Sequence, residues 1–127
     1  MTTEKFEFED LLVWEKAVDF ADLVLDKMER LDTTRKHYRI VEQMEAACTS
    51  IAMNIAEGKG RHFDKEYLQF LYYARGSMYE TITLLKIINR RRWIQDHDYY
   101  LIRSQALDIG RMLNALIRAI RKRVPKK

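Results

Sequence analysis

The chain has 127 residues, enough for one hydrophobic core, and we expect a single domain over residues 1–127. One proline and four glycines leave little material for turns, which favours a few long helices. The single cysteine excludes an intrachain disulfide and fits a reducing cytoplasm, and the lack of long uncharged apolar segments argues against a secretion signal or a membrane partner.

Charge is unevenly distributed along the sequence, whose net charge is +4. Residues 1–31 hold nine acidic and four basic side chains, whereas residues 97–127 hold two acidic and eight basic ones. Such asymmetry indicates either a nucleic-acid partner or complementary surfaces within an assembly.

The first predicted helix spans residues 11–31. Its apolar residues recur at helical spacing from Val13 to Leu31, and acidic residues line the opposite side. We expect Asp10 to be the N-cap and residues 32–34 to form the following turn. The acidic stripe is typical of a solvated face, and a docking surface for a basic partner is the alternative.

The second predicted helix spans residues 36–57 and carries no charge between Ala46 and Ala56. Its faces hold an apolar stripe, a polar row and a set of small or apolar residues, so no side is strongly polar. We therefore expect burial on nearly all sides. Gly58 and Gly60 are expected to end this helix with left-handed backbone.

The third predicted helix spans residues 64–91, with Asp64 as N-cap and an arginine triplet at its end. Because a glycine within a helix costs about 1 kcal/mol, Gly76 predicts close packing by a neighbouring backbone. The tyrosines of this helix are typical of core or interface aromatics, and a stacking platform for bases is the alternative. The fourth predicted helix spans residues 97–122, capped by Asp96, with one apolar and one basic side.

Four long helices joined by short turns predict an all-α, antiparallel up-down-up-down four-helix bundle. The second and third helices offer more apolar surface than one bundle can bury. We expect the excess to be buried between subunits of a homo-oligomer.

A row of polar residues on the second and third helices invites a catalytic interpretation, because it combines an acid, an amide and a cation. A structural hydrogen-bond network that sets the register of these helices or a subunit contact is the favoured interpretation. Its members are Gln43, Ser50, Asn54, Glu57, Arg61, Ser77 and Glu80.

No metal site or cofactor is expected, because the histidines are scattered and Glu-x-x-His pairs and phosphate loops are missing. Arg92 with His97, and Arg30 with His37, match the Arg-x(4–6)-His spacing of HEPN ribonucleases, which are also helical bundles. Such matches arise easily by chance in an arginine-rich chain. We therefore expect a protein without enzymatic activity, and a ribonuclease is the less favoured alternative.

The basic side of the fourth helix is the best candidate for a binding surface, because cations on one helix face can neutralise phosphates. A solvated face, or salt bridges to the acidic helix of another subunit, is the alternative. The candidate nucleic-acid-binding residues are Arg103, Arg111, Arg118, Arg121, Lys122 and Arg123.

From about Phe8 to Leu116 the chain resembles the four-helix-bundle proteins encoded in bacterial 23S rRNA intervening sequences, a family similar to the accessory variability protein (Avd) of diversity-generating retroelements. The resemblance rests on residues 11–17 (LLVWEKA), on residues 50–58 (SIAMNIAEG) with Arg61, and on residues 74–77 (ARGS) with Glu80. It implies a homopentameric ring without known catalytic activity. For the retroelement relatives it implies binding to RNA and to a reverse transcriptase.

Two departures from the family pattern shift this expectation. The segment 31–37 has no proline, and Glu45 and Ala46 stand where arginines are common in the family. Because these arginines are missing from the second helix, any RNA contact that the resemblance implies is expected on the basic side of the fourth helix instead. We expect an oligomeric RNA-binding accessory module that acts with a reverse transcriptase or another nucleic-acid enzyme. The alternative is a structural or protein-adaptor oligomer.

Overall fold

The structure, a computed structural model, describes residues 4–31 and 37–126. Its elements are a short 3-10 helix and four long α-helices: η1 (Glu7–Asp10), α1 (Leu12–Met28), α2 (Tyr38–Lys59), α3 (Asp64–Arg90) and α4 (Asp96–Arg123). The described residues contain no strand, so the predicted all-α class is confirmed. No helix among them is both long and apolar enough to cross a membrane.

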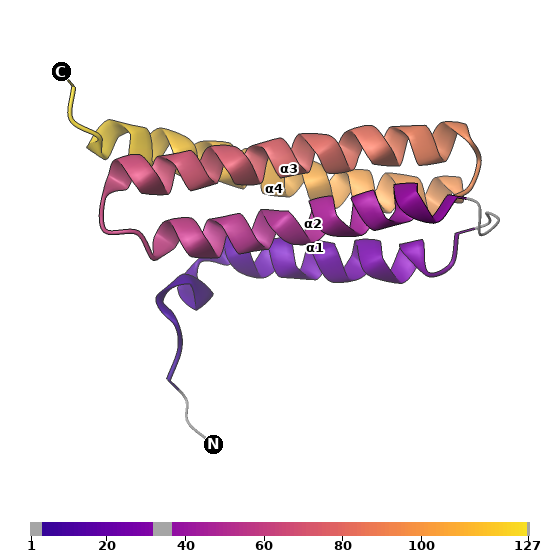
Figure 1. Cartoon of the computed structure of the whole chain (residues 1–127), viewed down its shortest axis with the longest axis horizontal. Helices are drawn as coiled ribbons and strands as arrows, with labels where there is room; N and C mark the ends of the chain where they lie inside the picture. The colour runs from indigo at the N-terminus through magenta and orange to yellow at the C-terminus, as the bar shows by residue number, and fades with distance from the viewer. Residues whose placement is uncertain (1–3, 32–36, 127) are drawn as a thin grey trace.

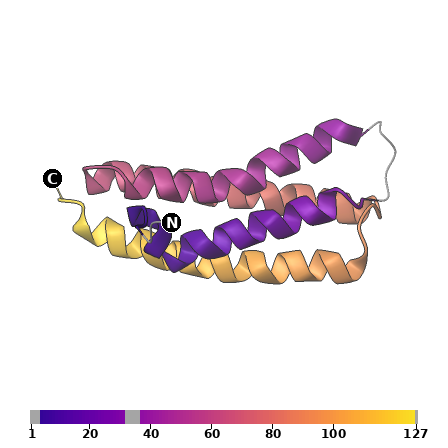
Figure 2. The same ribbon diagram turned by 90° about the horizontal axis from the view of Figure 1, so that it is seen from below.

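The four helices lie lengthwise beside one another (Figure 1). Each long helix packs against two others, α1 and α3 both contacting α2 and α4. The α2–α3 turn lies at the same end as η1 and the C-terminus, and the α3–α4 turn lies at the opposite end (Figure 1). The N-terminal half of α2 leans away from the other helices (Figure 2), which leaves Tyr38 exposed.

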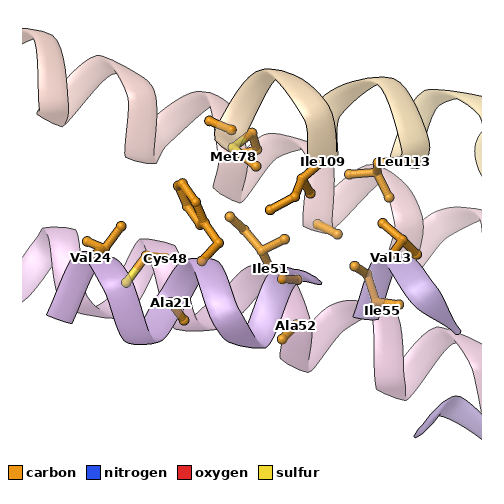
Figure 3. Packing of buried hydrophobic residues seen from close by; sticks show 14 of the residues in the cluster. Val13, Ala21, Val24, Cys48, Ile51, Ala52, Ile55, Met78, Ile109 and Leu113 are labelled. Carbon is orange, nitrogen blue, oxygen red and sulfur yellow. The ribbon is translucent and has the colours of Figure 1, made fainter. Parts of the chain in front are cut away.

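The core runs along the centre of the bundle and receives side chains from all four helices (Figure 3). The apolar stripes predicted from the 3.6-residue period are the buried faces, because each helix can cover its stripe only against its neighbours. Its largest fully buried side chains are Phe20, Met44, Ile51, Ile55, Leu71, Leu85, Ile88, Ile102, Ile109, Leu113, Ile117 and Ile120.

Each of the three predicted N-caps is wrong by one residue. Asp10 belongs to η1, and Leu11 stands at the N-cap of α1 without a side-chain hydrogen bond. Asp64 and Asp96 lie inside the first turns of α3 and α4, where a carboxylate interacts favourably with the helix dipole without capping. The predicted turn at residues 32–34 and the predicted start of the second helix at residue 36 lie outside the described residues.

The expectation of left-handed glycines at the end of α2 is also wrong. Gly58 lies within α2, Gly60 has a φ of −79°, and no described glycine has a positive φ. Gly58 is needed for space, because a Cβ there would lie 2.8 Å from the Cβ of Phe70 and 3.2 Å from the carbonyl oxygen of Tyr67. Among the residues that the structure describes, the one with left-handed backbone is Arg92, with a φ of 60°, shortly after α3.

Two packing expectations are not met within one chain. A Cβ at Gly76 would have no atom within 4 Å, so no neighbouring backbone among the described residues packs there. Burial of α2 on nearly all sides is not reached within one chain either, because α2 contacts only η1, α1 and α3, and its outer side leaves Met53 61% exposed; burial of that side between subunits stays a prediction.

Candidate functional site

The cations predicted on the basic side of α4 divide into those that contact another side chain of the described residues and those that make no ion pair. Arg111 is paired with Asp108 at 2.8 Å. Arg121 donates to the hydroxyl of Tyr72 at 2.7 Å, with its guanidinium 5.8 Å from that ring.

Arg123 joins the C-terminal end of α4 to the first turn of α3. Its Nε and Nη2 donate to the two carboxylate oxygens of Asp64 at 3.1 and 2.6 Å. This bidentate pair ties the C-terminal end of α4 to α3. By contrast, Arg103, Arg118 and Lys122 are exposed and make no ion pair within the described part of the chain.

A groove between α3 and α4 is formed by two adjoining hollows of about 620 and 490 Å³. The hollows share Ile82, Thr83 and Arg103, and we call them together the α3–α4 groove. Tyr79 from α3 and Tyr100 from α4 line it and are 62% and 63% exposed.

The electrostatic character of the α3–α4 groove is uniform. Its lining contains Lys86, Arg90, Arg103 and Arg111, and none of its lining residues is an aspartate or glutamate. An apolar floor with cations at its rim suits a flat, anionic ligand. Sequence reasoning missed Lys86 and Arg90, since the lining comes from two helices; their spacing of four residues on one side of α3 was the available signal.

The predicted polar row is brought together only in part. The hydroxyl of Ser77 donates to that of Ser50 at 2.9 Å, and the Asn54 amide donates to the same hydroxyl at 2.9 Å, joining α2 to α3. The Arg61 guanidinium lies over the Phe70 ring, 4.5 Å from its centroid. The three remaining side chains are exposed and make no hydrogen bond to the residues that the structure describes: Gln43, Glu57 and Glu80.

Within the described ranges, no hydrogen bond joins the arginine and histidine of either ribonuclease-like pair. Arg30 is paired with Asp26 at 3.2 Å, and the His37 ring packs on Trp93 with centroids 4.2 Å apart. His97 is exposed beside Asp98, at 3.5 Å.

The carboxyl of Asp98 has a pKa that its surroundings shift. Burial alone would raise its pKa, but the Lys27 ammonium at 3.2 Å and His97 outweigh burial, so the pKa is lowered. This places Asp98 in an ion pair between α1 and α4. Among the residues that the structure describes, no cluster of His, Cys, Asp or Glu is suited to hold a metal ion.

Two buried groups at the core have raised pKa values. Burial, with a smaller effect of Glu45, raises the pKa of the Cys48 thiol to about 11. Burial also raises the pKa of Tyr67, whose hydroxyl has no hydrogen-bond partner among the residues placed by the structure. Both groups are held in their neutral forms.

Comparison with known proteins assigns the chain to a family. The chain is similar in fold to the crystal structure of a protein of unknown function from the S23 ribosomal protein family of Bacteroides thetaiotaomicron, with a TM-score of 0.78 and 24% identity over 84% of this chain and 98% of that one. No curated protein matches the chain. Residues 9–115 match the family described as 23S rRNA-intervening sequence protein. The chain therefore belongs to the 23S rRNA-intervening sequence protein family.

Proposed function

We propose that this protein is a homo-oligomeric, non-enzymatic module that binds RNA through the cations of α4, as an antiparallel up-down-up-down bundle in the cytoplasm. One observation carries the proposal: Arg103, Arg118 and Lys122 are exposed on α4 without an acidic partner among the described residues. Cations that are not neutralised within the protein remain free to bind phosphates.

Oligomerisation would strengthen such binding. The outer sides of α2 and α3 expose apolar side chains, including Met53 and Tyr73, and a closed assembly would bury this surface. The resemblance to the Avd proteins makes a pentamer the first candidate. Several copies of a weakly binding cationic face would act together through avidity. A larger nucleic-acid enzyme, such as a reverse transcriptase, is the partner that the same resemblance favours.

The experiment measures RNA affinity by fluorescence anisotropy over a series of salt concentrations. One variant reverses the charge of Arg103, Arg118 and Lys122, and the matched control reverses three exposed cations elsewhere: Lys16, Arg39 and Lys65. Both variants change the net charge equally, so non-specific attraction falls equally in both. The proposal predicts that only the α4 variant loses most of its affinity and has a shallower salt dependence.

Two results would contradict this proposal. Wild-type protein that binds no RNA at low salt would exclude the nucleic-acid function, and equal losses in both variants would exclude α4 as the surface. Size-exclusion chromatography with light scattering tests the oligomer separately. A monomer at all concentrations would refute the assembly.

A protein-only oligomer is the second candidate function. The outer side of α1 exposes Glu15, Asp19 and Asp22, which complement the cations of the α3–α4 groove. An acidic face and a basic groove on different sides of one chain can join successive subunits in a ring. In that case RNA affinity would be absent, and high salt would dissociate the oligomer.

A further inference from the structure

We infer that the α3–α4 groove binds single-stranded RNA, with bases stacked on Tyr79 and Tyr100 and phosphates held by the cations at its rim. This inference rests on the proposed RNA-binding function and specifies its ligand. It moves the centre of binding from the outer side of α4 to the boundary between α3 and α4.

The two tyrosines present ring faces that the bundle does not use. Tyr79 of α3 lines one hollow of the α3–α4 groove and Tyr100 of α4 lines the other, and they are 62% and 63% exposed. Tyr100 is held at its edge by the buried Tyr99, with ring centroids 5.1 Å apart and planes at 75°. Because this contact orients the Tyr100 ring, little side-chain freedom remains to be lost on binding.

The floor of the groove is apolar and has room. Ile82 and Leu107 contribute apolar surface, and a Cβ at Gly110 would have no atom within 4 Å. A base that enters beside a tyrosine would cover this surface with its own flat face. Stacking of this kind is tolerant of base identity, so little sequence preference is expected.

Charge selects an anionic occupant. The cations of the lining are Lys86, Arg90, Arg103 and Arg111; of these, Arg111 is paired with Asp108, and no carboxylate belongs to the lining. A double-stranded RNA could meet these cations, but its base faces are covered within the stack. Use of both the rim cations and the tyrosine rings therefore requires a single strand.

The acidic outer side of α1 from another copy is the competing occupant, because it also complements the cations. It would not explain the two exposed aromatic rings, since carboxylates gain little from a tyrosine face, whose quadrupole is negative. The single strand accounts for both the cations and the rings.

The test compares binding of short oligouridine and of a short RNA duplex by the wild type and three tyrosine variants. Tyr79→Leu/Tyr100→Leu removes both rings, and Tyr79→Phe/Tyr100→Phe keeps them. Tyr38→Leu is the control, because Tyr38 is 58% exposed on α2 and is not among the residues that line the groove. Circular dichroism verifies that every variant is folded.

The leucine double variant is expected to bind oligouridine about tenfold or more weakly, whereas the phenylalanine double variant and the Tyr38 control bind like the wild type. The salt dependence should stay unchanged in the leucine variant, since its phosphate contacts remain. Duplex binding should also stay unchanged.

Each contrary result has a distinct meaning. If the leucine variant keeps full affinity for oligouridine while reversal of the α4 charges abolishes it, the stacking inference is wrong and the proposed function stands. If the leucine variant lowers the oligomer mass measured by light scattering, the groove is a subunit interface and the inference is wrong. If the wild type binds no RNA, the inference and the proposed function both fail.

Discussion

Gly58 is the position where one added methyl group should be most informative. Alanine there would bring its Cβ to 2.8 Å from the Cβ of Phe70, 3.0 Å from the ring of Tyr67 and 3.2 Å from the carbonyl oxygen of Tyr67. The Phe70 Cβ and the carbonyl oxygen cannot rotate away, so α2 and α3 must separate locally. Overpacking of this kind typically costs about 1 to 3 kcal/mol.

Gly76→Ala is the matched control. Gly76 also lies within a helix, and its added Cβ would touch nothing within 4 Å. Alanine improves helix propensity by up to about 1 kcal/mol at either position, so the comparison isolates the clash. We expect Gly76→Ala to raise the free energy of unfolding by about 0.5 to 1 kcal/mol. The free energy of unfolding of Gly58→Ala should be about 1 to 3 kcal/mol lower than that of Gly76→Ala.

Urea denaturation followed by circular dichroism measures both variants. Protein concentration must be equal in all samples, because association adds to apparent stability. A Gly58→Ala variant as stable as Gly76→Ala would refute the claim that the approach of α2 to α3 requires glycine. Destabilisation by Gly76→Ala would show instead that another subunit covers that glycine.

Three further outcomes follow from the described contacts. Ser50→Ala should lower the free energy of unfolding by about 1 kcal/mol, because the Ser77 hydroxyl loses its acceptor. The Ser50→Ala/Ser77→Ala double variant should lose less than the sum of the two single variants, since both changes remove the same hydrogen bond. Additive losses in a double-mutant cycle would contradict this coupling. Lys27→Met should raise the pKa of Asp98 in an NMR titration. Because the pKa of Asp98 is lowered in the folded state, its ion pair stabilises the protein above the ordinary aspartate pKa, and this stabilisation is lost as pH falls through the folded pKa. Lys27→Met should therefore destabilise the protein at neutral pH but not in acid. The buried Cys48 thiol, with a pKa of about 11, should react with thiol reagents only after unfolding, and rapid reaction in the native protein would contradict its burial.

Much of the architecture follows from local sequence periodicity. The apolar stripes from Val13 along α1 and from Ile102 along α4 mark the faces that the bundle buries, because a 3.6-residue period places them on one side of a helix. The segment 50–58 with Arg61 and the segment 74–77 also carried the family resemblance, which the family match over residues 9–115 confirms.

Contacts between helices could not be obtained in this way, because they depend on how close two helices approach and on their register. The sequence alone made Gly58 a helix terminator and Gly76 a packing site, whereas the structure puts the tight contact at Gly58 and open space at Gly76. The two glycines differ in this way because α3 approaches α2 closely at Gly58, whereas no atom lies near the Cβ position of Gly76.

The candidate site shows the same division. The basic composition of α4 was evident from its residues, but only the tertiary structure decides which cations are neutralised, as Arg123 is by Asp64, 59 positions earlier in the chain. It also assembles the α3–α4 groove from residues of two helices that are separate in the sequence. A helical period describes one helix at a time, whereas a groove exists only between two.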